Sequence, residues 1–309
     1  MADCGWALAL HGGAGTILKE TMTPDREAGY RAGLEAALAA GREVLSAGGS
    51  AEDAVVATVM VLEDNPLFNA GRGSVLTSAG TVEMDAAIMR GRDRAAGTVA
   101  GIHGVRNPIC LARRVMERSD HVMFCGAGAQ VFALEQGFEE LPASYFETEH
   151  RRNQLREAQE KNEISLDHND HKYGTVGCVA RDRNGDLAAA TSTGGMTNKR
   201  PGRVGDSPVI GAGTYASNDG AAISATGHGE AFIRETVARD IAALVQYAGL
   251  DLTEAVRRKV MVDLPRIGGD GGVIAIAPAG APVLMFNTRG MYRASACEGG
   301  DAKLGIYAD

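Results

Sequence analysis

The most constraining feature of this 309-residue sequence is an abrupt change of character at Gly174-Thr175. Before it, residues 151–172 (RRNQLREAQEKNEISLDHNDHK) are almost wholly polar, which is typical of a solvated linker. After it, small and apolar residues in TVGCVARDRNGDLAAATST flank Asn184-Gly185, which is the strongest short-range signal for a hairpin. The sequence therefore predicts that a paired strand begins at Thr175.

The hairpin turn predicts which residues face each other. If Asn184-Gly185 is a two-residue loop, Thr175 lies opposite Gly194 and Thr193 is its diagonal neighbour. We therefore expect two threonine hydroxyls to converge, with Gly194 and Gly195 leaving open space beside them. A slip of one residue would change every facing pair, so the coordinates test this prediction.

The remaining pattern predicts helices and strands in separate groups. Helices are expected at 24–47, 51–64, 108–117 and 127–135, as one long amphipathic segment from 232 to 248, and from Asp251 onward. Strands are expected at the N-terminal apolar run and around 82–89, 97–105, 175–181, 187–193, 209–217, 221–227, 271–278, 282–288 and 292–296. Because strands cluster together, we predict an α+β fold with two stacked sheets and helices outside, forming one unit over residues 1–309.

Composition narrows the class of protein. A net charge of −8 argues against a nucleic-acid partner, because phosphate binding needs clustered Lys and Arg. Five cysteines without CxxC spacing suggest neither a disulfide framework nor a zinc site. We expect no membrane partner, because no run reaches membrane-spanning length. The stretch MADCGWALALHGG lacks a basic leader and is predicted to be a first strand, so we expect a cytoplasmic protein.

The threonine after the linker is a candidate nucleophile. A hydroxyl needs a base to take its proton, and a threonine at a chain terminus can use its own α-amine, which titrates near pH 8. Cleavage of Gly174-Thr175 would therefore create a nucleophile and a base together, with no catalytic cofactor. Taken alone, Thr175 is more often an ordinary strand residue.

Three other motifs have both a chemical and a structural interpretation. Arg203 and Asp206 in GRVGDSP suit the carboxylate and ammonium of a free amino acid, although a surface salt bridge is the commoner explanation of such a segment. Thr226 and the amide of Gly227 in SATGHGE could donate to an oxyanion, or form only a strand-to-helix turn. HGGAG at 11–15 could likewise present amides to an oxyanion, but no GxSxG elbow accompanies it.

A second histidine-containing segment is a weak candidate for a metal site. The residues concerned are His168, His171, Asp167 and Asp170. They lie in the polar stretch, where a solvated run of charges is the better interpretation.

Several motifs, in their order and spacing, resemble one known family. They are HGGAG, LEDNPLFNAGRGS, MDAAIM, GTVG, ATSTGG, NKRPGRVGDSP, ATGHGE and FNTRGMYRA. Together they are similar to the plant-type L-asparaginase / isoaspartyl peptidase family of N-terminal nucleophile (Ntn) hydrolases, from about residue 6 to the C-terminus. The resemblance implies a four-layer αββα sandwich and autocleavage into an α subunit, 1–174, and a β subunit, 175–309. It also implies a dimer of αβ heterodimers, with 148–173 as a flexible linker at the end of the α subunit.

The resemblance also implies the roles of individual residues. Thr175 would be the nucleophile, Thr193 would support its hydroxyl and amine, and Thr226 with Gly227 would hold the oxyanion. Substrate binding is implied for Arg203 at the α-carboxylate, for Asp206 at the α-ammonium, and for Gly229 and Asn69 lining the pocket. A structural sodium ion is implied on the backbone carbonyls of Leu62, Glu63, Asn65, Phe68, Ala70 and Arg72.

The expected activity is hydrolysis of the β-amide of L-asparagine and of β-aspartyl dipeptides, with release of L-aspartate. One alternative is a glycosylasparaginase-type amidase, against which the absence of Asn-x-Ser/Thr acceptors counts. Another is a noncatalytic protein that captures an amino acid with Arg203 and Asp206, and such a protein would remain one polypeptide. The sequence does not fix the preference between asparagine and dipeptides.

Overall fold

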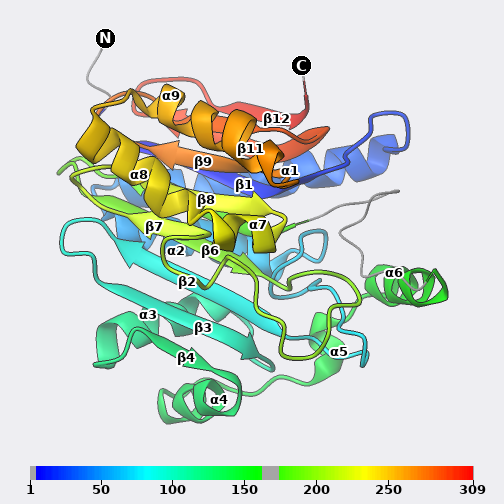
Figure 1. Ribbon diagram of the computed structural model, residues 1–309. Helices are drawn as coiled ribbons and strands as arrows, with labels where there is room; N and C mark the ends of the chain where they lie inside the picture. Colours follow the sequence, from blue (N-terminus) through cyan, green and yellow to red (C-terminus); the bar gives the residue numbers. More distant parts are fainter. Residues whose placement is uncertain (1–4, 162–173, 309) are drawn as a thin grey trace.

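The computed structural model describes residues 5–161 and 174–308 (Figure 1). The His168 and His171 group and the last part of the expected linker lie outside these residues. The elements in chain order are β1 (Ala7–Gly15), α1 (Pro24–Ser46), α2 (Ala51–Asp64), β2 (Met84–Arg90), β3 (Ala96–Ile102), α3 (Pro108–Arg118), β4 (Met123–Cys125), α4 (Gly126–Glu135), α5 (Ala143–Phe146), α6 (Glu149–Glu160), β5 (Val176–Arg181), β6 (Leu187–Thr193), β7 (Thr214–Ala216), β8 (Ala222–Gly227), α7 (Gly229–Arg234), α8 (Val237–Ala248), α9 (Leu252–Arg257), the π-helix η1 (Arg258–Asp263), α10 (Leu264–Arg266), β9 (Gly271–Ile276), β10 (Val283–Phe286), β11 (Gly290–Cys297) and β12 (Lys303–Tyr307).

The strands form two sheets, and the fold class is α+β. An eight-stranded sheet has the order β12-β11-β1-β5-β6-β2-β3-β4, and a four-stranded sheet has the order β10-β9-β8-β7. Strands β8 and β9 of the smaller sheet contact β1, β5 and β6 of the larger one. Helices α1, α2 and α3 pack on the larger sheet, and α8 and α9 pack on the smaller (Figure 1). The element that follows Thr175 therefore lies in the middle of the molecule.

Alternation along the central strands explains why both faces of the large sheet are buried. On β1, Leu8 and Leu10 belong to the apolar cluster under α1 and α2, whereas Ala7 and Ala9 face the cluster between the sheets. Successive strand side chains point to opposite faces, so one strand contributes to two cores. The small residues toward the second sheet let the two sheets approach closely.

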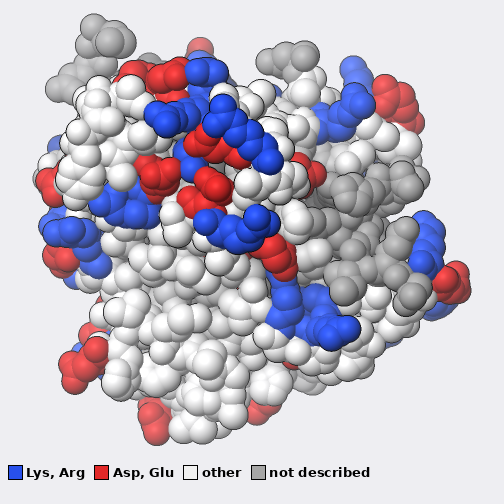
Figure 2. All heavy atoms as spheres, in the orientation of Figure 1, with Lys and Arg blue, Asp and Glu red and all other residues white. Residues whose placement is uncertain are grey.

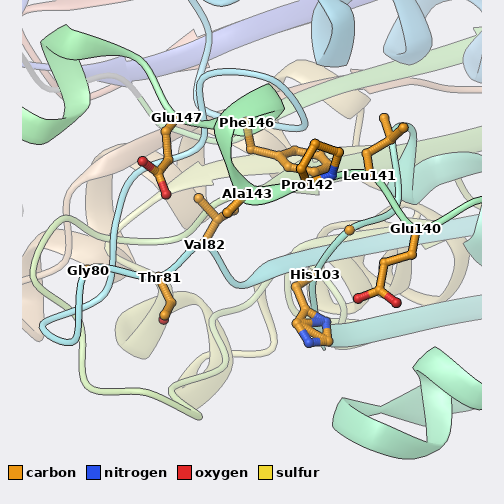
Figure 3. A pocket seen from close by; sticks show the side chains of 11 residues that line it. Gly80, Thr81, Val82, His103, Glu140, Leu141, Pro142, Ala143, Phe146 and Glu147 are labelled. Carbon is orange, nitrogen blue, oxygen red and sulfur yellow. The ribbon is translucent and has the colours of Figure 1, made fainter.

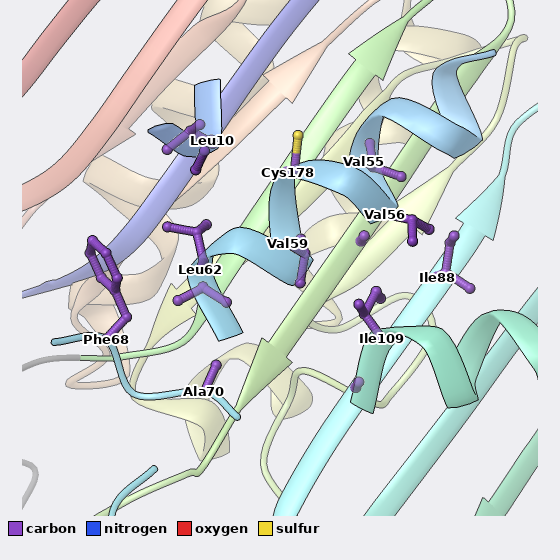
Figure 4. Packing of buried hydrophobic residues seen from close by; sticks show 14 of the residues in the cluster. Leu10, Val55, Val56, Val59, Leu62, Phe68, Ala70, Ile88, Ile109 and Cys178 are labelled. Carbon is purple, nitrogen blue, oxygen red and sulfur yellow. The ribbon is translucent and has the colours of Figure 1, made fainter. Parts of the chain in front are cut away.

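Helix α2 shows how one apolar helix supports this sheet. Its side chains at Val55, Val59 and Leu62 are fully buried. Figure 4 shows them among Leu10 of β1 and Cys178 of β5, on the face away from the small sheet. Burial of a side chain of this size contributes about 1.5–3 kcal/mol each. The helix therefore fixes the strand that begins after Thr175.

The hairpin register differs from the prediction by one residue. Val176 pairs with Ser192 and Arg181 with Leu187, so the same register places Thr175 opposite Thr193 rather than Gly194. The cause is the turn: the Asp182 amide donates to the carbonyl of Asp186, which makes a three-residue loop with Gly185 at a φ of 84°. The Asp182 carboxylate also accepts from the Asn184 and Asp186 amides, which stabilises this longer loop.

Part of the predicted linker is helical. Residues 149–160 form α6, which begins at the N-cap Thr148, whose hydroxyl accepts from the Arg151 amide. The Arg151 side chain is 2% exposed and its Nε donates to the Gly73 carbonyl at 2.6 Å. A linker over residues 149–160 was therefore a wrong expectation, because the buried Arg151, Leu155 and Ala158 anchor a mostly polar helix.

Strand β4 and helix α5 were not predicted, and two further departures have an identifiable cause. The segment predicted as one amphipathic helix is split into α7 and α8 by Thr236, which has left-handed backbone angles of φ 44° and ψ 46°. Strand β12 was not predicted, because its exposed edge position leaves only Ile306 fully buried. Neither departure changes the region around Thr175.

The surface is uneven in charge. Figure 2 shows acidic and basic side chains gathered over the part of the molecule that carries α8 and α9, and fewer over the part that carries β3, β4 and α4. Exposed apolar side chains near β4 and α4 are Val122, Met123, Val131 and Leu134. Among the described residues, no helix combines the length and apolar character needed to cross a membrane.

Candidate active site

The two threonine hydroxyls predicted to converge do meet. Thr175 precedes β5 and Thr193 ends β6, and Thr175 Oγ1 donates to Thr193 Oγ1 at 3.1 Å. Thr193 Oγ1 also accepts from the Gly195 amide at 2.8 Å. Thr175 is 6% exposed and Thr193 is 2% exposed. The hydroxyl of Thr175 is thus held in a desolvated position with a fixed orientation.

The peptide before Thr175 is enclosed by two other predicted segments. A Cβ built on Gly13 would lie 2.5 Å from the Gly174 nitrogen and 2.8 Å from its carbonyl oxygen. A Cβ on Gly174 would lie 2.8 Å from Thr226 Oγ1, which accepts from the Ala14 amide at 3.2 Å. Because that amide occupies an acceptor position on Thr226, the hydroxyl proton of Thr226 can be donated elsewhere. HGGAG therefore packs on the peptide that precedes Thr175.

The predicted binding pair lies next to this cluster. Arg203 and Asp206 come together at the start of α7, where a Cβ on Gly229 would lie 3.0 Å from Arg203 Nη2 and 2.9 Å from Asp206 Oδ1. Arg203 donates from Nε and Nη2 to the Glu230 carboxylate at 3.0 and 2.9 Å. This bidentate pair fixes the plane of the guanidinium.

Asp206 is the more unusual member of the pair. It is 3% exposed, and its Oδ2 has no hydrogen-bond partner among the described residues. Burial raises the pKa of its carboxyl to about 7, although the Arg203 charge acts in the opposite direction. A buried acceptor without a partner is suited to a cationic ligand.

Asn69 joins the loop after α2 to the end of β6. Its Nδ2 donates to the Gly195 carbonyl at 2.8 Å, and its backbone carbonyl accepts from the Gly194 amide at 3.0 Å. The direction in which a side chain would point is filled at both glycines. Asn69 Oδ1 lies 2.5 Å from the position of a Cβ on Gly194, and Lys199 Nζ lies 3.0 Å from that of Gly195. Glycine is needed at both positions for close packing.

In the loop expected to bind sodium, the carbonyls of Glu63, Pro66 and Phe68 lie close to residues 72–73. The Arg72 amide donates to the Glu63 carbonyl at 2.7 Å, which closes the loop. Gly73 has a φ of 100°, and a Cβ on it would meet the carbonyl oxygens of Pro66 and Phe68, the latter at 2.9 Å. Hard cations prefer such oxygen ligands, so the loop fits the ion in its donor chemistry. The ion itself stays a prediction.

Two residues near the site were missed by the sequence reasoning. Ser207 follows Asp206 in the chain, and its Oγ donates to Thr175 Oγ1 at 3.4 Å. Asp85 of β2 pairs with Thr193, is fully buried, and its Oδ1 accepts from the Gly101 amide at 2.8 Å. Burial raises the pKa of Asp85, against the opposite effect of the Lys199 charge. An aspartate inside the apolar run MDAAIM is the signal that could have found it.

A separate cavity lies outside this cluster. Its volume is about 490 Å³, and it is lined by residues of 80–82, 103–104, 140–143 and 146–147. Figure 3 shows His103 and Glu140 close together on one side, with Glu147 on another. None of the lining residues is one of the predicted site residues.

Comparisons with known proteins agree with the arrangement of these motifs. Residues 4–306 match the family described as Asparaginase. The chain is 50% identical to the isoaspartyl peptidase of Salmonella typhimurium, with 98% of each chain covered. It is 45% identical to a plant-type L-asparaginase of Pyrococcus abyssi (95% and 97% covered) and 43% identical to the isoaspartyl peptidase/L-asparaginase of Homo sapiens (93% and 92% covered). With the motifs ordered around Thr175 and the match extending over almost its whole length, the chain belongs to the asparaginase family of hydrolases.

Proposed function

We propose that this chain is an autoprocessing threonine hydrolase that cleaves the β-amide of L-asparagine and of β-aspartyl dipeptides. The observation that carries this proposal is the buried Thr175 hydroxyl, 3.1 Å from the Thr193 hydroxyl and directly after the enclosed Gly174 peptide. The names of the similar proteins support the substrate class.

Substrate binding uses the charged pair beside the hydroxyl cluster. Arg203 holds the α-carboxylate of the substrate, and Asp206 accepts hydrogen bonds from its α-ammonium group. Gly229 leaves room for the amino acid backbone, and Asn69 holds the wall of the pocket formed by Gly194 and Gly195. These contacts direct the β-carbonyl of the substrate toward Thr175.

The chemical steps follow from the positions of the hydroxyls. Thr175 Oγ attacks the β-carbonyl, and its proton moves to the free α-amine of Thr175. Thr226 and the amide of Gly227 donate to the developing oxyanion, and Thr193 holds the nucleophile in place. The C–N bond breaks, the leaving ammonia or amino acid takes the proton, and an aspartyl ester remains. A water, deprotonated by the same amine, then hydrolyses the ester to L-aspartate.

The active amine requires an earlier cleavage. In the precursor, Thr175 Oγ attacks the carbonyl of Gly174, the peptide C–N bond breaks, and the resulting ester is hydrolysed. The products are the chains 1–174 and 175–309. Packing of Gly13 and Thr226 against Gly174 supports this step, because it restrains the peptide that is to be cut.

Three further parts of the proposal rest on the family. We assign the two sheets and their covering helices to a four-layer αββα sandwich of the Ntn-hydrolase type, with assembly as a dimer of αβ heterodimers. We also propose that the carbonyls of the loop 62–72 hold a structural sodium ion, which would supply no catalytic chemistry.

A denaturing gel with N-terminal sequencing tests the central claim. We expect a fragment beginning TVGCV in the wild type, and a Thr175→Ala variant that stays whole and inactive. Thr77→Ala, which removes a hydroxyl bonded to Thr81, serves as a control that is still cut. An active, uncut Thr175→Ala protein would refute the mechanism.

The same preparations separate the alternatives. Assay with asparagine, a β-aspartyl dipeptide and a glycosylated asparagine distinguishes the proposal from a glycosylasparaginase-type amidase. A wild-type chain that binds aspartate but remains whole and turns over none of these substrates would favour a noncatalytic amino-acid-binding protein.

A further inference from the structure

A chain of four buried polar side chains lies behind Thr175, between the two sheets. His11 of β1 contacts the Thr175 carbonyl oxygen through Nδ1 at 2.9 Å and Ser224 Oγ of β8 through Nε2 at 2.9 Å. Ser224 Oγ lies 2.7 Å from Thr191 Oγ1 of β6, and Thr214 Oγ1 of β7 donates to Thr191 Oγ1 at 2.6 Å. All four side chains are fully buried.

The chemistry of the end group sets the direction of this chain. A carbonyl oxygen only accepts, so His11 Nδ1 carries the proton and donates to Thr175. Nε2 of a neutral imidazole then accepts, and the Ser224 hydroxyl must donate to it. Ser224 in turn accepts from Thr191, and Thr191 accepts from Thr214. The protons of His11 Nδ1, Ser224 and Thr191 therefore point toward the carbonyl of Thr175, whereas the single Thr214 proton is shared between two acceptors, Thr191 Oγ1 and the Ser207 carbonyl.

The surroundings of His11 support a neutral imidazole. Full burial lowers the pKa of His11 to about 3, because an imidazolium would lose its hydration there. Space for the ring is provided by Gly177, the residue of β5 that pairs with His11. A Cβ on Gly177 would overlap Ser224 Oγ and lie 2.6 Å from His11 Nε2. The contact between ring and hydroxyl is thus built into the packing of both sheets.

The other end of the chain returns to the same threonine. The Ser207 carbonyl is the second acceptor for the Thr214 hydroxyl, at 2.9 Å, and Ser207 Oγ donates to Thr175 Oγ1 at 3.4 Å. Side chains from four strands and one loop therefore restrain both the carbonyl and the hydroxyl of Thr175.

We propose that His11 is a positioning residue for Thr175, and that Ser224, Thr191 and Thr214 fix its tautomer and orientation. The inference rests on the proposed role of Thr175 as a nucleophile. Once the bond to Gly174 is broken, Thr175 loses the covalent restraint on its amino side, and chain ends fray unless they are tied down. The His11 hydrogen bond to its carbonyl then holds the amine and hydroxyl in the reactive arrangement.

Replacement of one internal hydroxyl tests the proposal without touching substrate. We expect Thr191→Val to lower kcat about 10- to 100-fold, since small misplacements of reacting groups cost that much, with KM near the wild-type value. Thr191→Ser keeps the hydroxyl and should restore kcat. Thr58→Val is the matched control: Thr58 is fully buried, but its hydroxyl donates to the Ala54 carbonyl of its own helix.

The rates are measured per cleaved chain, with Tm recorded for each variant. A Thr191→Val protein that stays uncut while Thr58→Val is cut also supports the proposal, because the same hydroxyl performs both reactions. Thr191→Val with wild-type kcat and complete cleavage would overturn it.

The tautomer of His11 provides a second measurement, which is made on the wild-type protein. In ¹⁵N-histidine-labelled wild-type protein, with the signal assigned by its loss in His11→Gln, we expect a proton on Nδ1 and none on Nε2. A proton on Nε2 would contradict the direction of the chain. Thr175→Ala distinguishes failure of the proposed function from failure of the positioning role. An active Thr175→Ala protein would show that Thr175 is not the nucleophile. An inactive Thr175→Ala protein together with a fully active Thr191→Val protein would show that only the positioning role is wrong.

Discussion

At the scale of single residues, the site combines groups that water would normally solvate. Asp206 is nearly inaccessible, and its carboxyl faces the positive charge of Arg203 and the negative charges of Glu230 and Asp85. The attraction to Arg203 does not offset the loss of hydration, which is why the pKa of Asp206 is raised to about 7. A substrate ammonium group would supply the missing partner.

This pKa predicts how KM depends on pH. Because the pKa lies above its ordinary value of 3.8, the carboxylate form increases as pH rises through about 7, and with it the attraction for an ammonium group. We expect KM for asparagine to be about tenfold higher at pH 6 than at pH 8. The measurement is KM across this range for wild type and for Asp206→Asn, whose KM should be high and nearly constant. A wild-type KM that does not change with pH would contradict the prediction.

The residues that sequence reasoning found and missed differ in a physical way. The sequence could predict the contact between Thr175 and Thr193, because a turn signal and strand pairing relate these two residues locally. Ser207 and Asp85 reach the same cluster only through long-range packing, so no spacing along the chain predicts their contacts. Side-chain chemistry already suggested that Arg203 and Asp206 bind a free amino acid, the resemblance implied the same roles, and the structure places both residues beside Gly229.

At the scale of elements, the predicted and observed helix and strand boundaries agree best where the sequence carries a strong capping or turn signal. Helices α1 and α2 begin where Thr23 and Ser50 cap them, and both side chains accept from a backbone amide in the first turn. The hairpin turn was wrong by one residue because the Asp182 side chain favours the longer loop. The break between α7 and α8 has no sequence signal, because threonine is unusual in left-handed backbone.

That break predicts a stabilising substitution. Thr236 is exposed and holds a β-branched side chain at φ 44°, a conformation that costs about 1–2 kcal/mol. We expect Thr236→Gly to raise Tm by about 2 °C, as measured by thermal denaturation. Arg234→Gly, in ordinary helix two residues earlier, should instead lower Tm. If both variants lowered Tm equally, the backbone at Thr236 would not be strained.

At the scale of the whole molecule, the close approach of the two sheets depends on small residues. Gly177 lies where β5 faces β8, and a Cβ there would overlap Ser224 Oγ and lie 2.9 Å from the Ala190 carbonyl. We expect Gly177→Ala to destabilise the fold by about 1–3 kcal/mol through overpacking. Gly128→Ala, in α4 with open space around it, should stabilise by about 0.5–1 kcal/mol. Denaturant unfolding of both variants measures the contrast, and equal effects would argue against tight spacing of the sheets.

The strand order has a consequence for folding before and after cleavage. Strands β1 to β4 precede residue 174 and β5, β6, β11 and β12 follow it, yet β1 lies between β11 and β5, and β2 lies beside β6. Breaking the bond at 174–175 would therefore separate no pair of neighbouring strands. The precursor can assemble this interleaved sheet as one polypeptide, whereas a matured protein that is once unfolded must bring two molecules together by diffusion. Maturation would thus make refolding depend on protein concentration, and the native state would owe its persistence to slow unfolding.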